Sequence, residues 1–125
     1  MTISRQGLDD LEADINESLE SECIEITFSG HFTKDRVNDP RNKPMITLKE
    51  LESIFKQFKA IHAQTVVGYS SSDTFVLKCN NSKINLPCIV ELIRKFNQPW
   101  VRITVMTVMR KPVFLSNDKY ELFVN

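Results

Sequence analysis

Residues 31–42 hold a dense group of side chains that could act on a phosphodiester. The string HFTKDRVNDPRN combines one histidine, three cations and two carboxylates. Cleavage of RNA by attack of its 2′-hydroxyl needs a group that accepts a proton, a group that donates one, and cations for the charge on the phosphorane. Histidine suits the proton transfers because its pKa lies near neutrality, and arginine suits the phosphate because its planar fork matches two oxygens. The segment is therefore a candidate site for RNA cleavage.

His31 is the candidate proton-transfer group of this segment. The side chains that could hold the nucleic acid beside it are Lys34, Arg36, Arg41, Asn42 and Lys43. If residues 31–37 are helical, His31, Lys34 and Asp35 share one face, whereas Arg36 points about a hundred degrees away from Asp35. A simpler interpretation stands beside this one: the charged loop is solvated surface, and Asp39 only pairs with Arg41 to rigidify the turn.

A second polar group follows the string WVRITVMTVMRK, residues 100–111. Thr107 and Arg110 lie on opposite faces of this predicted strand by alternation. Arg110 and Lys111 stand at its exit, where they can add positive charge to a neighbouring cleft. The second histidine, His62, continues the apolar face of a predicted helix, so we expect it to be structural.

The formal net charge of zero hides a segregation of charge along the chain. Residues 1–25 carry eight Asp or Glu against one Arg, a net charge of −7, and residues 26–125 carry fifteen Lys or Arg against eight Asp or Glu, a net charge of +7. We expect an acidic helical segment, 1–22, ahead of a basic domain, 23–125. The basic body could bind RNA, and the acidic helix could bind a host protein. The acidic residues could equally just favour the start of a helix and keep the protein soluble.

Composition and motifs exclude several other classes. No apolar run approaches the ~20 residues that span a bilayer, and the N-terminus lacks the layout of a signal peptide, so we expect a cytosolic protein without a membrane partner. Three widely spaced cysteines indicate neither a disulfide framework nor a zinc site. The phosphate-loop, dinucleotide, zinc-protease and nucleophile-elbow motifs are missing. The sequence predicts no metal and no cofactor.

The elements that would position the site begin with helices. Apolar residues recur at helical spacing over residues 8–20, and IEITFS, residues 24–29, alternates as a short strand would, although a helix is possible there. The string NDPRNKP predicts a loop. Thr47 and Glu50 then form a T-x-x-E capping box, which predicts a helix from Leu48 to about residue 63.

The rest of the chain has the period of strands. Strand patterns cover residues 64–69, 74–79, 84–95, 100–111 and 119–124. Pro87 cannot donate a ladder hydrogen bond, so its strand should be at an edge or bulged there, and residues 100–111 should form a central strand. These patterns predict an α+β domain with N-terminal helices followed by a four- to five-stranded antiparallel sheet.

Three strings, HFTKDRVNDPRNKPMITLKEL, INLPCIVEL and ITVMTVMRK, resemble a family of small proteins of tailed bacteriophages. In that family a histidine leads into R-V-N-D-P-R-N, I-T-x-x-E-L follows, and T-x-M-R-K comes late. More distantly, the layout resembles the barnase, EndoU, colicin and RelE-like ribonucleases, which cut RNA without metal in a basic cleft on an antiparallel sheet.

These resemblances imply roles for particular residues. His31 would be the general base or acid, Arg36, Arg41 and Arg110 would hold phosphate, and Thr107 would lie near the scissile bond. The implied protein is a phage-encoded, metal-independent endoribonuclease that acts on RNA in the host cytoplasm. The alternative is a non-enzymatic phage protein that binds nucleic acid or inhibits a host protein.

Overall fold

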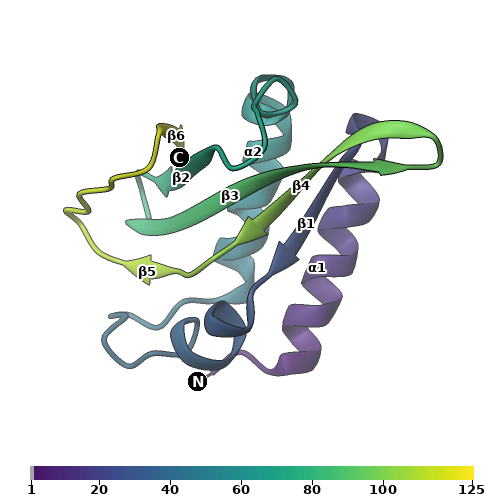
Figure 1. The fold of residues 1–125 in the computed structure, drawn as a ribbon. Coiled ribbons are helices and arrows are strands. Elements are labelled where there is room, and N and C mark those ends of the chain that lie inside the picture. The colour runs from purple at the N-terminus through teal and green to yellow at the C-terminus, as the bar shows by residue number, and fades with distance from the viewer. Residues whose placement is uncertain (1) are drawn as a thin grey trace.

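Two helices pack on one face of a six-stranded sheet in the computed structural model, which describes residues 2–125 (Figure 1). The elements follow one another as α1 (Arg5–Leu19), the 3-10 turn η1 (Glu20–Glu22), β1 (Ile24–Phe28), the π-helix η2 (His31–Arg36), α2 (Leu48–Val66), β2 (Thr74–Cys79), β3 (Ile84–Lys95), β4 (Gln98–Val105), β5 (Met109–Arg110) and β6 (Tyr120–Val124). The strand order is β1-β4-β3-β2-β6, and β5 pairs with β3. The predicted α+β class is confirmed.

The sheet is mixed, so the prediction of a purely antiparallel sheet was wrong. The strand β3 is antiparallel to both of its neighbours, β2 and β4, but β1 runs parallel to β4, and β6 runs parallel to β2. Tight turns force the three central strands to alternate in direction. The outer strands enter the sheet through long connections, which permit either direction.

The segment 64–69 was predicted to be a strand, and this was also wrong. Helix α2 continues to Val66, and the chain then turns towards Tyr69. Val66 is fully buried on the same helix face as Phe55 and Phe58. Burial against the core therefore outweighs the local preference of adjacent valines for a strand.

The predicted start of α2 is confirmed in detail. The Glu50 amide donates to Thr47 Oγ1 at 3.2 Å, and the Thr47 amide donates to Glu50 Oε1 at 3.0 Å. These reciprocal bonds satisfy two amides that a helix start leaves free. The helix that carries Glu50 is thus fixed at the end nearest the candidate site.

The interior strands explain the position of Pro87. Strand β3 lies between β2 and β4, so it is not an edge strand. The pairing of β3 with β4 ends at Cys88, and its pairing with β5 begins at Asn85. Pro87 falls in the gap between the two, where no partner strand needs the amide hydrogen that proline lacks.

The predicted central strand is confirmed as β4, but it ends at Val105 rather than at residue 111.

Both outer strands have their free edges covered by helix side chains. Along β1, Asn16 of α1 donates to the Ile26 carbonyl at 2.9 Å and accepts from the Ile26 amide at 2.6 Å. Glu12, one turn earlier, accepts from the Phe28 amide at 2.8 Å. Because α1 also buries its leucines in the common core, the acidic segment belongs to the body of the domain.

Along β6, α2 does the same. Gln57 donates to the Asn125 carbonyl and accepts from the Asn125 amide, both at 2.8 Å. His62 Nε2 lies 2.7 Å from the Phe123 carbonyl oxygen, a contact that fits the structural role expected of this histidine.

Within residues 2–125, no helix has the length and apolar character needed to cross a bilayer.

Candidate nucleic-acid interface

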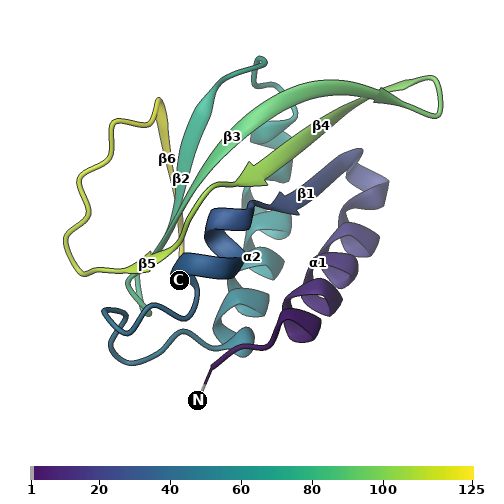
Figure 2. The ribbon, with the colours of Figure 1, turned by 60° about the horizontal axis from the view of Figure 1, so that its bottom comes forward.

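A cleft of about 330 Å³ lies between the segment that follows η2 and the strand β5. Figure 2 shows η2 beside the connection from β4 to β5. The lining residues are Arg36, Asp39, Arg41, Asn42, Val108, Met109, Arg110 and Lys111. The cleft thus lies between residues of the segment 31–42 and the end of the predicted strand 100–111.

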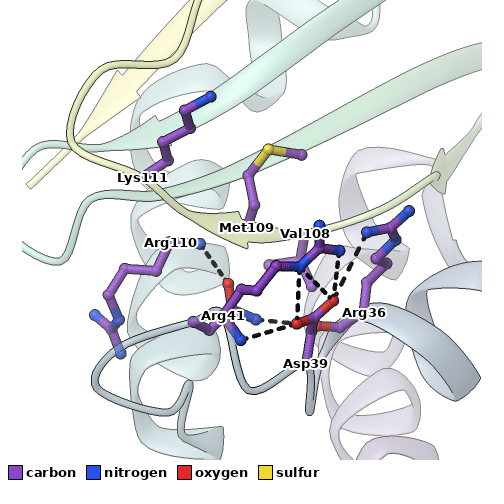
Figure 3. A pocket seen from close by; sticks show the side chains of 8 residues that line it. Arg36, Asp39, Arg41, Val108, Met109, Arg110 and Lys111 are labelled. Carbon is purple, nitrogen blue, oxygen red and sulfur yellow. Dashed lines mark hydrogen bonds and ion pairs between the residues drawn. The ribbon is translucent and has the colours of Figure 1, made fainter.

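Two arginines converge on one carboxylate in this cleft. Arg41 donates through Nη2 to Asp39 Oδ2 at 2.7 Å and through Nε to Asp39 Oδ1 at 3.1 Å. Arg36 Nη1 lies 3.7 Å from the same Oδ2, so the two side chains approach Asp39 from different sides (Figure 3). The hydrogen bonds from Arg41 lower the pKa of Asp39 to about 2. An anion already sits where the two guanidinium groups meet.

The exposure of these groups differs in a way that matters for ligand binding. The Arg41 side chain is 74% exposed, whereas that of Asp39 is 16% exposed. Arg41 can therefore turn outward to a ligand, while Asp39 stays at the floor of the cleft. A pair this exposed is weak in water because solvent screens it.

The π-helix places His31 between a carboxylate and a guanidinium. His31 Nδ1 lies 3.3 Å from Asp35 Oδ2, and Arg36 Nε donates to His31 Nε2 at 2.9 Å. An arginine Nε can only donate, so Nε2 must carry the lone pair and Nδ1 the proton. The imidazole is thus held in one tautomer, with its basic nitrogen covered by Arg36.

This contact corrects the geometry expected from an α-helix, in which Arg36 would point away from Asp35 and its face. A π-helix bonds residues five apart, as the Val37 amide does to the Phe32 carbonyl at 3.0 Å. Positions 31 and 36 consequently lie next to each other. The wider turn is anchored because the Phe32 ring is fully buried and stacks on Phe28 at 4.7 Å.

No family model matches the chain, and no curated protein or solved structure matches it. The resemblances to phage proteins and to ribonucleases therefore stay predictions.

Arg110 occupies the cleft wall but directs its side chain inward, away from the Asp39 cluster (Figure 3). It is 8% exposed and forms a bidentate ion pair with Glu50, at 2.9 and 2.8 Å. Its remaining guanidinium hydrogens go to the carbonyls of Pro44, Met45 and Ser82. All five donors are used, so this guanidinium has none free for the phosphate contact that the resemblance implied.

Asn42 is also committed to the structure of the loop. It is 4% exposed, donates to the Arg36 carbonyl at 3.0 Å and accepts from the Arg110 amide at 2.8 Å. It therefore ties the end of η2 to β5 across the cleft. Asn42 and Arg110 position the site rather than contact a ligand.

The other predicted site residues lie around the cleft without lining its floor. Lys34 and Lys43 are exposed. Lys111 lines the rim and points away from the Asp39 cluster (Figure 3). Thr107 lies in the connection between β4 and β5, half-buried, and does not line the cleft. Val108 and Met109 form an apolar wall of the cleft that was not predicted. In the sequence these two residues only continue the apolar pattern of the preceding strand.

The cleft carries a positive charge overall. Arg110 is balanced by Glu50, and the remaining charges are those of Arg36, Arg41 and Lys111 against Asp39, a net charge of +2. Within residues 2–125, no group of three or more His, Cys, Asp or Glu side chains could hold a metal ion. The cations of the cleft can bind anions, and the neighbouring His31 can transfer protons.

Proposed function

We propose that the protein binds single-stranded RNA through this cleft and cleaves it with His31. The observation that carries the proposal is the convergence of Arg36 and Arg41 on one carboxylate. Guanidinium groups that hold a carboxylate by two parallel bonds can hold a phosphate in the same way. A phosphodiester would replace Asp39 as the partner of Arg41, and Lys111 would contact a neighbouring phosphate from the rim.

Cleavage is supported by the position of His31. When a phosphodiester takes up Arg36, the lone pair of Nε2 is uncovered, while Asp35 keeps the ring oriented through Nδ1. Nε2 then accepts the proton of the 2′-hydroxyl, the bond from O2′ to phosphorus forms, and the bond from phosphorus to O5′ breaks. Water protonates the leaving oxygen, and the hydroxide that remains takes the proton from Nε2, which restores the neutral imidazole. The two arginines stabilise the charge that develops. No metal takes part in these steps.

As the resemblance implied, the proposed protein is encoded by a phage and acts on RNA in the host cytoplasm. The second candidate function is RNA binding without cleavage. It is favoured by the bond from Arg36 to His31, which covers Nε2, the basic nitrogen of the imidazole next to the cleft.

Binding is tested by measuring the dissociation constant of a labelled single-stranded RNA over a range of salt concentrations, with EDTA present. We expect Arg41→Ala to weaken binding and to lower the slope of log K against log salt by about 0.7, the effect of one lost phosphate contact. Lys56→Ala is the matched control, because Lys56 is an exposed cation on α2 that pairs only with Glu52. An affinity independent of salt, or equal losses in both variants, would contradict the proposal.

Asp39→Asn should have the opposite effect. Asparagine keeps an oxygen to accept from the Arg41 amide, which donates to Asp39 Oδ1 at 2.9 Å, but it removes the charge that competes with phosphate. We expect RNA to bind about fivefold more tightly at neutral pH. Since the pKa of Asp39 is about 2, this gain should persist throughout the mildly acidic range. Unchanged or weaker binding would show that Asp39 does not compete with the ligand.

A further inference from the structure

The hairpin that joins β3 to β4 carries a second group of unusual side chains, far from the arginine cleft (Figure 1). Its two turn residues, Phe96 and Asn97, have φ angles of 53° and 61°. Turns of this kind favour asparagine and glycine, and a bulky side chain in the left-handed region is strained. Phe96 is nevertheless 78% exposed. The turn thus holds an aromatic ring in water at a conformational cost.

Trp100 lies behind this turn with an unused hydrogen-bond donor. The residue is 6% exposed, and its Nε1 is, among residues 2–125, the one buried side-chain nitrogen or oxygen without a partner. The Phe96 ring and the Lys95 ammonium lie 6.4 and 4.4 Å from the Trp100 ring. Phe96 belongs to the turn, and Lys95 is the last residue of β3 before it. A buried donor without an acceptor raises the free energy of the folded state, and a ligand that supplies an acceptor removes this penalty.

Two hollows flank Trp100. One, of about 470 Å³, has apolar walls that include Val67, Leu92 and Pro99. The other, of about 300 Å³, lies towards the C-terminal end of α1 and includes Phe96. Leu92 is 50% exposed in the larger hollow. Apolar walls that stay open to water are typical of a surface that receives an apolar side chain.

The rim of these hollows is acidic. Glu17, Glu20 and Glu22 form no ion pair among the described residues, whereas Glu25 is neutralised by Lys95 at 2.9 Å and Arg102 at 2.6 Å. Set against Arg94 of the hairpin, the three glutamates leave a negative charge. Such a rim repels phosphate and attracts lysine and arginine.

We propose that this hairpin surface, residues 92–101 together with Glu17, Glu20 and Glu22, docks a peptide segment of a partner protein. The segment carries one large apolar side chain between lysine or arginine residues. The apolar side chain enters the larger hollow, the basic side chains pair with the glutamates, and a carbonyl of the segment accepts from Trp100 Nε1 as Phe96 moves aside. The proposal is independent of RNA binding, because it uses none of the residues of the arginine cleft.

The test uses the single tryptophan of the chain as its reporter. A panel of short peptides, each with a central leucine, phenylalanine or tryptophan flanked by lysines, is titrated into the full-length protein. The indole N–H resonance of Trp100 is followed by NMR. We expect a saturable shift with at least one peptide. Leu92→Ser and Glu20→Lys should each raise the dissociation constant about tenfold, and the exposed control Lys56→Ala should leave it unchanged.

Four outcomes would overturn the proposal. These are no shift with any peptide of the panel, an equal shift with peptides in which glutamates replace the lysines, an equal shift with single-stranded RNA, and self-association of the protein that Leu92→Ser abolishes. The last would assign the surface to a second copy of the chain. Leu92 and Glu20 are both exposed, so the variants should keep the melting temperature of the parent.

Discussion

Replacing His31 with alanine should lower the rate of RNA cleavage by about 10²- to 10⁴-fold, the usual contribution of a positioned general base. The His31 imidazole lies next to Arg36 of the cleft, with its Nε2 lone pair facing the Arg36 Nε–H and its Nδ1 facing Asp35. Alanine removes that lone pair but changes little of the fold, since His31 is exposed. The rate is measured by following a labelled RNA in the presence of EDTA.

His31→Gln separates proton transfer from positioning. A glutamine amide can accept from Arg36 through its oxygen and donate to Asp35 through its nitrogen, but it cannot take up a proton at neutral pH. We expect it to cleave as slowly as His31→Ala while binding RNA as the parent does. Recovery of cleavage by glutamine would assign His31 a purely positioning role. Equal cleavage by the parent and by both variants would assign the activity to another protein in the preparation.

Replacing Arg110 with alanine should lower the free energy of unfolding by about 3 kcal/mol, the lower end of the cost of breaking a buried ion pair, because the Glu50 side chain is 29% exposed and keeps part of its hydration. The change leaves Glu50 uncompensated and removes donors from three carbonyls that come together around the guanidinium. Urea denaturation at neutral pH measures the loss. Arg110→Lys keeps the charge but not the planar fork, so we expect it to recover only part of the stability.

The same pair predicts how stability depends on pH. Hydrogen bonds from Arg110 are the main cause that lowers the pKa of Glu50 below its usual value. The stabilisation is therefore complete above the ordinary carboxyl pKa and is lost as the pH falls through the lowered pKa of the folded state. In Arg110→Ala, the acid limb of the stability curve should be flatter than in the parent. A loss below 1 kcal/mol, or an unchanged acid limb, would show that the pair contributes little.

The sequence predicted most elements of the fold because their signals are local. The capping box at Thr47 and the alternation in residues 74–79 and 84–95 determine where α2, β2 and β3 begin. The direction of β1 and β6 could not be predicted, because it depends on long connections rather than on pattern. The extension of α2 through Val66 was missed because burial on a helix face is a property of the packed core.

The geometry of the candidate site could not be predicted from the sequence. Charge and residue type identified the segment that carries His31, Arg36 and Arg41. The contact between His31 and Arg36 depends on a π-helix, for which the sequence has no recognisable signal. Arginine often binds phosphate, but the guanidinium of Arg110 is bound instead by Glu50 and by carbonyls of two other loops. Hydrogen bonds between residues so far apart in the chain cannot be predicted from the spacing of residues in the sequence.

The helix side chains along β1 and β6 determine how this molecule can meet others. Asn16 binds the outward amide and carbonyl of β1, and Gln57 binds those at the end of β6. A further strand beside Ile26 and Phe28 of β1, or beside the end of β6, could be added only if these helix side chains were displaced first. The chain is thus protected from the edge-to-edge stacking that leads to fibres. Association is left to side-chain surfaces, where a single substitution can adjust one partner without affecting another.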